Sequence, residues 1–495
     1  MTASTVLATP RDGGKLLPPP RARPGRSAFA LWPVLAIAAV AGLATAWAGA
    51  VRAYQYDELY FQASGRYLSW GYADQPPLVP LWTRLADEMA PGSSLVFRLP
   101  AVLLFVAGIV ATAAIAREFG GRARAQTFAA AAYAVSPWLV IAAQWTATYS
   151  FDPHLWTIVL WLVVRAVGRP GQRRYWGLLC AGLVTTVDLQ VKFLIPLLWI
   201  SALIAAFTVG PRWLVRRIEL WAGLVVSAVV CLPTLRWQAN HGWPYAQMQQ
   251  VVAAESPRIT LIPVGLVGFG VISGMVFAVY GLWQLLCSAE LAQWRFLGFA
   301  TAGSVICLLI AGGRSYYLAD YTGLLVAAGA VGVQAARPAR WWGWSVTGRA
   351  IVLSALFPVL LLPLGPSGWN PLDRLIHSAE VSPAVATGAQ AAWADLPPDQ
   401  RAHTALVAQT YPLASAVDAY SPLRAYSPHR GYWYFRTPPA TADEVIWIGD
   451  DPARLRQWFT TVTRLPSQPA GPPMWKATGR RAEWTTIWDS WRRML

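Results

Sequence analysis

Residues 54–78 read YQYDELYFQASGRYLSWGYADQPPL and follow the first long apolar run of the chain. The stretch combines three carboxylates (Asp57, Glu58 and Asp74) with seven aromatic side chains. Flat, amphipathic rings are enriched where a protein meets the lipid headgroup layer, and a carboxylate at this depth is costly unless it serves a function. The Pro-Pro pair lacks two backbone donors, so regular helix must end there. We therefore predict a membrane-surface loop that forms half of an active site.

The composition indicates a membrane protein. Of the 495 residues, 55% are hydrophobic and only 13% are charged, and the mean hydropathy is +0.38. A soluble domain carries about a quarter charged residues. The net charge of +16 would suggest nucleic-acid binding in a soluble protein. Here the basic residues cluster in short loops between apolar runs, as membrane topology requires, and no polar domain shows a basic face. We therefore predict the lipid bilayer as a partner and no nucleic acid.

Apolar runs of roughly 20 residues predict membrane-spanning helices. The N-terminal residues 1–27 are rich in Pro, Gly and Arg and are expected to be a disordered cytoplasmic segment. The first apolar run is too long for a cleaved signal peptide and is expected to be retained. About eleven spans follow from the candidates 28–50, 94–116, 125–145, 153–168, 176–189, 191–208, 214–234, 259–286, 296–312, 318–336 and 348–365.

The basic residues predict the orientation of these spans, because Lys and Arg accumulate in cytoplasmic loops. The N-terminus is then cytoplasmic, provided that residues 176–208 cross the membrane twice. The predicted cytoplasmic basic residues are Arg21, Arg23, Arg26, Arg117, Arg122, Arg124, Arg165, Arg169, Arg173, Arg174, Arg212, Arg216, Arg217, Arg337, Arg340 and Arg349. The segments 51–93, 146–152, 235–258 and 312–317 are left outside the cytoplasm.

The chain changes character near residue 366, where the apolar spans stop. The strand-like run 444–448 is followed by Gly-Asp-Asp-Pro and an amphipathic stretch, a pattern typical of a β–turn–α unit. We predict an α-helical polytopic membrane domain over residues 28–365, with a first outer loop at 51–93 and a small extracytoplasmic α/β domain at 366–495. The four cysteines lie in or beside apolar runs and are expected to pack as small side chains.

Chemistry-bearing residues from separated segments are predicted to share the outer face. They are the Asp57–Glu58 pair, Asp152 and His154 in TYSFDPHLW, His241 in RWQANHGWPYAQMQQ, Arg314, Tyr316, Tyr317 and Asp320 in GGRSYYLADY, and Lys192 near an outer turn. Each also has a structural reading. The Asp57–Glu58 pair suits a hydrated interfacial pair, Asp152 suits a helix N-cap before Pro153, Lys192 suits snorkelling, Arg314 suits a helix anchor, and His241 suits a solvated loop. Asp188 either caps a broken helix or faces a cavity. The hypothesis of a site rests on co-location.

Carboxylates beside cations at one membrane face suit a lipid-linked phosphate donor and a hydroxyl or amine acceptor. A carboxylate acts as general base on the acceptor, while Lys and Arg stabilise the departing phosphate. Because phosphate on an anomeric carbon already leaves readily, positioning supplies much of the acceleration.

The order of these motifs resembles a known family. Asp-Glu, GYADQPPL, SLVFRLPAVL, FDP, WQANHGWPYAQMQ and GGRSYYLADY follow one another as in the protein mannosyltransferase and aminoarabinose transferase superfamily, over roughly residues 30–335. This resemblance implies the GT-C fold of integral-membrane glycosyltransferases. It also implies inverting transfer of one sugar from a polyprenyl-phosphate carrier to a lipid, a cell-wall glycan or a protein. The tail after residue 366 is similar to the outer domain of bacterial members.

The resemblance also implies individual roles. Asp57 matches the acidic residue of the first loop that serves as base or site organiser, Glu58 is its neighbour, and Asp152 matches the acidic residue of the second outer loop. Arg314 precedes the paired tyrosines and is expected to contact phosphate. Gln75 stands where relatives carry His or Lys, so Lys192, Arg98 or His241 is expected to replace that contact. The candidate catalytic residues are Asp57, Glu58 and Asp152, and the candidate substrate-binding residues are Tyr60, Gln75, Arg98, Lys192, His241, Arg314, Tyr316 and Tyr317.

Two alternatives remain at this point. A divalent cation shared by Asp57, Asp152 and His154 is compatible with their chemistry, but no ligand spacing demands one, so no metal is assigned. A flippase or transporter of lipid-linked sugars would use the same charges as a translocation path. It would place ionisable residues near the membrane midplane on several helices, whereas the predicted spans are nearly free of them apart from Asp188 and Lys192.

Overall fold

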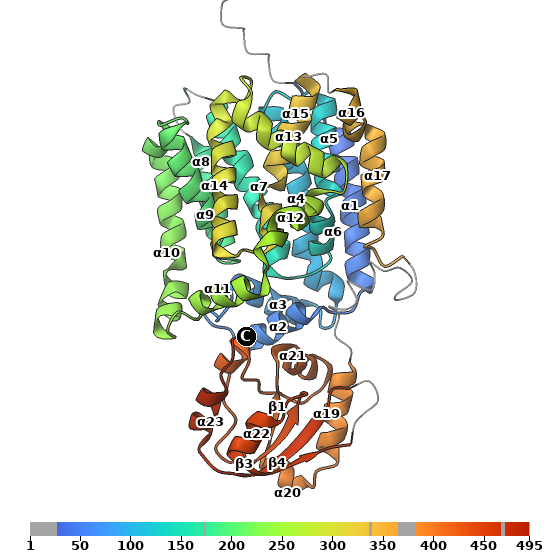
Figure 1. The fold of residues 1–495 in the computed structure, drawn as a ribbon, viewed down its shortest axis with the longest axis vertical. Helices are drawn as coiled ribbons and strands as arrows, with labels where there is room; N and C mark the ends of the chain where they lie inside the picture. Colours follow the sequence, from blue (N-terminus) through green and yellow to red (C-terminus); the bar gives the residue numbers. More distant parts are fainter. Residues whose placement is uncertain are drawn as a thin grey trace, which may run out of the picture.

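In the computed structural model, the chain forms a helical bundle with a smaller mixed domain at one end (Figure 1). The structure describes residues 27–169, 171, 175–335, 339–364, 383–466 and 471–494. The predicted disordered segment lies outside the described residues, apart from residue 27. The predicted domain boundary at 365–366 also lies outside them. The four strands found in the described residues fall within residues 404–480.

The bundle consists of long apolar helices and several shorter ones. Five described helices are long and apolar enough to cross a membrane, or six if one bent pair counts as a single span, and four shorter apolar helices accompany them. The predicted total of eleven spans stays a prediction. The bundle helices are α1 (Leu31–Val51), α4 (Ser94–Glu118), α5 (Ala123–Ala134), α6 (Pro137–Ala142), α7 (Thr148–Val167), α8 (Trp176–Leu189), α9 (Ile195–Thr208), α10 (Ile218–Asn240), α12 (Leu261–Phe269), α13 (Ser273–Cys287), α14 (Arg295–Ala311), α15 (Thr322–Ala335), α16 (Arg340–Gly343) and α17 (Gly348–Val359).

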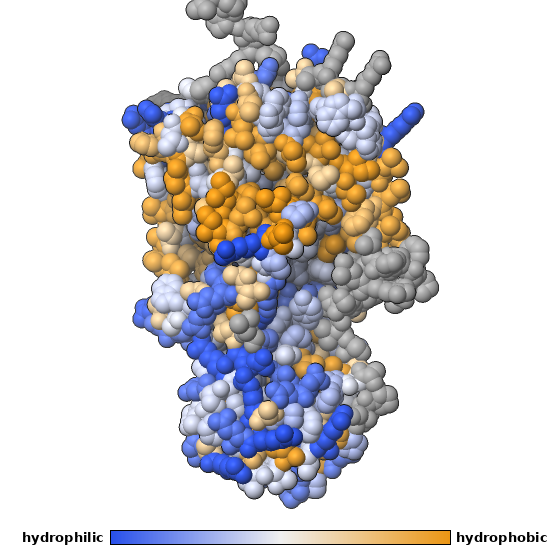
Figure 2. Space-filling model, viewed as in Figure 1, coloured by the Kyte–Doolittle hydropathy of each residue, from blue (hydrophilic) through white to orange (hydrophobic). Residues whose placement is uncertain are grey.

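The outer surface of the bundle is apolar, as a protein in lipid requires. Figure 2 shows a broad band of hydrophobic residues across the visible face of the bundle, with hydrophilic residues concentrated at its ends and on the small domain. On α10, Val225 and Val229 expose more than half of their surface. Soluble monomers rarely expose contiguous apolar patches of this size. The chain is therefore a helical, multi-pass membrane protein, as predicted.

Two predicted spans are each broken into two helices. The predicted span 125–145 contains α5 and α6, because Pro137 starts a new helix and keeps Ser136 extended. The predicted span 259–286 contains α12 and α13, which are separated at Gly270 with φ of 149°. That conformation is accessible to glycine and unfavourable for other residues. The prediction of continuous helices was wrong at these two places.

The end of the bundle that meets the small domain, here called the domain-facing end, is covered by three short helices: α2 (Tyr56–Arg66), α3 (Leu78–Met89) and α11 (Pro244–Glu255) (Figure 1). Helix α2 begins with a capping box, in which Gln55 and Glu58 satisfy each other's backbone N–H groups. Helix α2 ends earlier than predicted, at Arg66, and the Pro-Pro pair lies directly before the start of α3 instead of at the end of a helix. The exposed side chains Leu81, Leu85 and Met89 of α3 suit a helix lying in the membrane interface.

The C-terminal domain is built on a four-stranded sheet of order β1-β2-β4-β3. Strands β1 and β2 are parallel, and the other two pairs are antiparallel. The predicted β–turn–α unit is confirmed, since β2 spans Glu444–Ile448 and α22 follows it. The elements are α19 (Ala384–Ala394), α20 (Pro398–Ala402), β1 (Thr404–Ala408), α21 (Tyr411–Tyr420), β2 (Glu444–Ile448), α22 (Ala453–Trp458), β3 (Phe459–Arg464), β4 (Met474–Arg480) and α23 (Trp484–Trp491).

Helix α2 joins the bundle to this domain. Tyr60 and Ala63 are buried in the same apolar cluster as Ala414, Val417 and Tyr432 of the C-terminal domain. The fit is close, because a Cβ atom on Gly431 would lie 1.8 Å from Tyr60 Oη. The C-terminal domain therefore packs directly against the stretch in which the sequence predicts catalytic residues.

Candidate active site

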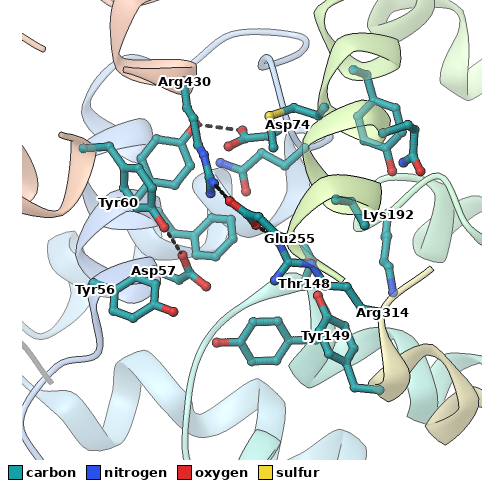
Figure 3. Close-up of a pocket in the computed structure, with 18 of the residues that line it drawn as sticks. Tyr56, Asp57, Tyr60, Asp74, Thr148, Tyr149, Lys192, Glu255, Arg314 and Arg430 are labelled. Atoms are coloured by element: carbon teal, nitrogen blue, oxygen red, sulfur yellow. Dashed lines mark hydrogen bonds and ion pairs between the residues drawn. The ribbon is translucent and has the colours of Figure 1, made fainter. Parts of the chain in front are cut away.

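A cavity of about 380 Å³ lies between the domain-facing end of the bundle and the C-terminal domain (Figure 3). Helices α2, α7, α11 and α21, the loop between α8 and α9 and the segment before α15 all contribute to its wall. The lining residues are Tyr56, Asp57, Tyr60, Phe61, Asp74, Gln75, Thr148, Tyr149, Val191, Lys192, Tyr245, Met248, Gln249, Val252, Glu255, Arg314, Tyr316, Tyr317, Tyr411, Pro412 and Arg430. The predicted residues Asp57, Tyr60, Gln75, Lys192, Arg314, Tyr316 and Tyr317 are thus brought together.

Asp57 occupies the first turn of α2, where the helix dipole favours a negative charge. Its Oδ1 accepts a hydrogen bond of 2.9 Å from Tyr411 Oη of the C-terminal domain, and its backbone N–H donates to Gln55 Oε1. Burial raises the pKa of the Asp57 carboxyl, and the Tyr411 hydroxyl and nearby Arg430 and Arg314 oppose that rise. These groups hold a carboxylate in one orientation at the cavity wall.

A second carboxyl group, Asp74, lies near Asp57. Tyr60 Oη donates to Asp74 Oδ1 over 2.7 Å. Burial raises the pKa of Asp74 to about 6, although the Tyr60 hydroxyl counteracts part of the rise. Gln75, which follows it, is buried with its Oε1 lacking a hydrogen-bond partner among the described residues. This part of the cavity therefore offers Gln75 Oε1 as a hydrogen-bond acceptor and Asp74 as a carboxyl group that can exchange a proton near neutral pH.

Three cations also line the cavity: Lys192, Arg314 and Arg430. Arg314 Nη2 pairs with Glu255 Oε2 at 2.7 Å, and Arg430 Nη2 pairs with Glu255 Oε1 at 2.5 Å. Lys192 forms an ion pair with Asp152 and lies 4.2 Å from the centroid of the Tyr317 ring. Figure 3 shows Arg314 and Arg430 reaching Glu255 from opposite sides.

Asp152 lies behind Lys192 and does not line the cavity. It is fully buried inside α7, which begins four residues earlier at Thr148, so the alternative that Asp152 caps this helix was wrong. Asp188 at the end of α8 and Asp320 before α15 lie within electrostatic reach of Asp152 and Lys192. Asp152 is therefore placed to orient the Lys192 ammonium group rather than to contact a ligand in the cavity.

Glu58 and Arg98 form a buried clamp away from the cavity. Arg98 Nε and Nη2 donate to the two Glu58 oxygens at 2.8 and 2.6 Å, and both side chains are at most 1% exposed. Glu58 also accepts from the backbone N–H of Thr146 and of Gln55. These bonds connect α2, α4 and the segment before α7. The geometry favours a structural role for both residues in place of the catalytic and substrate-binding roles expected from the sequence.

His241 lies at a different place. Its ring stacks on Trp237 with centroids 4.0 Å apart, and it lines a separate cavity of about 290 Å³ with Tyr434 and Phe435. It therefore does not replace the contact that Gln75 leaves open. Of the three candidates for that contact, Lys192 is the one that lines the main cavity, whereas Arg98 is paired with Glu58.

Among the described residues, no three His, Cys, Asp or Glu side chains are grouped so that they could hold a metal ion. His154, one of the three ligands considered for a shared cation, is buried and bonds through Nδ1 to Tyr133 Oη at 2.7 Å. We assign no metal to this cavity.

The comparisons with known proteins agree with this architecture. Residues 74–237 match the family model described as dolichyl-phosphate-mannose-protein mannosyltransferase. The chain is similar to the solved structure of ArnT from Cupriavidus metallidurans bound to undecaprenyl phosphate, with 16% identity, 90% of this chain and 97% of that chain covered, and a TM-score of 0.61. The apo state of the same protein gives 17% identity, the same coverage and a TM-score of 0.58. No curated protein matches the sequence.

The chain therefore has the GT-C fold of integral-membrane glycosyltransferases, as the sequence resemblance predicted. The family match covers residues 74–237, and the structural likeness, at 16% identity, extends the same fold over most of the chain.

Proposed function

We propose that the chain is an inverting glycosyltransferase that moves a single sugar from a polyprenyl-phosphate carrier to a hydroxyl or amine acceptor. The observation that carries this proposal is the cavity itself, in which an oriented carboxylate, Asp57, shares one space with Lys192, Arg314 and Arg430. A base and several cations are the groups that displacement of a phosphate requires.

The residues divide the reaction between them. Asp57 Oδ1 is held by Tyr411, which leaves Oδ2 to take the proton from the acceptor. The acceptor oxygen or nitrogen forms a bond to the anomeric carbon while the bond from that carbon to the phosphate oxygen breaks. The electron pair stays on the phosphate, and Lys192 and Arg314 stabilise its charge. Attack from the face opposite to the phosphate inverts the anomeric configuration.

Two of the comparisons support a lipid-linked donor. The ArnT structure contains undecaprenyl phosphate, and the matched family model is described by a dolichyl-phosphate-mannose donor and a protein acceptor. We extend only the shared chemistry, a polyprenyl phosphate with one sugar, to this chain. A lipid, a glycan and a protein all remain acceptors to be tested.

The distribution of buried charges favours an enzyme over a transporter. Asp152, Asp188 and Asp320 lie at the ends of their helices that approach the cavity, beside Lys192. A transport path would need ionisable groups farther along the spans. In the described spans this cluster is confined to the domain-facing end, as a site at one membrane surface requires.

Asp57→Asn tests this function. Without the general base, we expect sugar transfer to fall at least 100-fold, so that cells carrying only this variant accumulate the same lipid-linked sugar as cells lacking the protein. The accumulated lipid is identified by mass spectrometry. Asp87→Asn on the neighbouring α3 removes a carboxylate that does not line the cavity and should restore the wild-type lipid profile. Full transfer by Asp57→Asn protein, at normal abundance in the membrane, would contradict the proposal.

A further inference from the structure

Glu255 makes an unusual pair of contacts at the cavity. Its two carboxylate oxygens are bound by arginines from different parts of the protein: Oε2 by Arg314 of the bundle and Oε1 by Arg430 of the C-terminal domain. Two guanidinium groups converging on the separate oxygens of one anion form an oriented oxyanion site. The same arrangement would bind two oxygens of a phosphate group.

The position of Glu255 argues against a purely structural anchor. It is the last residue of α11, where the negative end of the helix dipole disfavours a carboxylate. Its side chain is 36% exposed, and ion pairs of this exposure contribute little to stability. Next to it, the chain turns by 76° between α11 and the following helical segment. The carboxylate can therefore be displaced at small cost.

Arg430, by contrast, is held firmly. Its side chain is 15% exposed and lies 5.3 Å from the Tyr411 ring centroid, and its backbone N–H donates to Arg493 O over 2.7 Å. Its backbone has φ of 50°, a conformation that non-glycine residues adopt infrequently. Such strain is retained where surrounding structure enforces it, often at ligand sites. The next residue, Gly431, packs against Tyr60 of α2, which fixes this arginine relative to the cavity.

We propose that Arg430 and Arg314 together form the subsite for the donor's phosphate, and that Glu255 holds its place until the donor displaces it. The C-terminal domain then supplies a donor-binding residue, and an internal carboxylate competes with the phosphate. This inference rests on the proposed function, because it assumes a polyprenyl-phosphate donor.

Binding of undecaprenyl phosphate to the purified full-length protein in detergent tests the subsite without requiring the sugar or the acceptor. Undecaprenol, which lacks the phosphate, measures how much the polyprenyl tail alone contributes to binding. We expect Arg430→Gln to weaken undecaprenyl phosphate binding at least tenfold, because one charge-assisted contact is lost. We expect Glu255→Gln to tighten it severalfold, because the competing charge is removed. Neither variant should change undecaprenol binding.

Matched controls lie elsewhere in the C-terminal domain. Glu444→Gln breaks a half-buried ion pair with Lys476, and Arg454→Gln removes a hydrogen bond to Trp491 O. Both should bind undecaprenyl phosphate as the wild type does. In the double variant Glu255→Gln/Arg430→Gln, replacing Glu255 should tighten undecaprenyl phosphate binding less than it does when Arg430 is present. The reason is that the site then lacks one of the two arginines for which carboxylate and phosphate compete. Thermal unfolding of each variant confirms that it is folded.

The outcomes separate this inference from the proposed function. If the wild type prefers undecaprenyl phosphate to undecaprenol but Arg430→Gln binds it normally, or Glu255→Gln weakens binding, the subsite is overturned and the donor class stands. If the wild type shows no preference for the phosphate, the proposed function itself fails.

Discussion

At the scale of single residues, the hydrogen bond from Tyr411 to Asp57 links the C-terminal domain to the proposed base. We expect Tyr411→Phe to lower kcat about tenfold near neutral pH, because a hydrogen bond to a charged group is lost. The Tyr411 hydroxyl opposes the burial that raises the pKa of Asp57. Its removal should therefore raise that pKa further and move the acid limb of the pH–kcat profile to higher pH.

The control for this prediction is Tyr426→Phe, which alters another tyrosine of the C-terminal domain that does not line the cavity. A uniform loss of kcat with an unchanged acid limb would mean that Tyr411 only supports the fold and does not position Asp57.

The sequence predicted that Asp57 and Glu58 act at the same site, whereas the structure places only Asp57 at the cavity. Adjacent residues of a helix point in directions about 100° apart, so Asp57 faces the cavity while Glu58 faces Arg98. The sequence Asp57-Glu58 alone does not show that the two carboxylates face different surroundings. Tyr411 and Arg430 lie more than 350 residues after Asp57 in a domain whose packing the sequence does not reveal. The only hint is that Tyr411 follows an apolar strand.

At the scale of elements, the Glu58–Arg98 clamp connects α2, α4 and the segment before α7. Glu58→Gln leaves the Arg98 charge buried without its carboxylate, and breaking a buried pair in this way costs about 3–5 kcal/mol. We expect a large drop in thermal stability in detergent, measured by scanning fluorimetry, and partial recovery in Glu58→Gln/Arg98→Met, which buries no unpaired charge. A Glu58→Gln protein of normal stability that has lost transfer would instead support the catalytic role expected from the sequence.

The observed helices show which features of the bundle the hydropathy of the sequence predicts. It located apolar helices within every predicted span, because the apolar composition is continuous. It did not reveal the interruptions at Pro137 and Gly270, since the residues on both sides stay apolar. The extended conformation before Pro137 and the glycine-specific conformation of Gly270 are properties of the local backbone. Hydropathy averaged over a stretch of sequence carries no information about them.

At the scale of the whole molecule, the C-terminal domain packs on the same end of the bundle as the cavity (Figure 1). Sequence composition indicated this domain and placed it on the face of the predicted site. It did not indicate that the domain completes the cavity wall through Tyr411, Pro412 and Arg430. That contact arises because α2 buries Tyr60 and Ala63 in the core of the C-terminal domain.

The arrangement of the two ends of the bundle also predicts the orientation of the molecule in the membrane. Arg122 and Arg124 lie at the junction of α4 and α5, at the end of the bundle away from the C-terminal domain (Figure 1). Since Arg and Lys favour cytoplasmic loops, we expect the cavity and the C-terminal domain to lie outside the cytoplasm. In a variant whose four cysteines are replaced by Ala, Asp450→Cys should react with a membrane-impermeant maleimide in intact cells. Arg124→Cys should react only after the membrane is permeabilised. The reverse pattern would place the cavity in the cytoplasm, where a donor presented at the outer leaflet cannot reach Arg314 and Lys192.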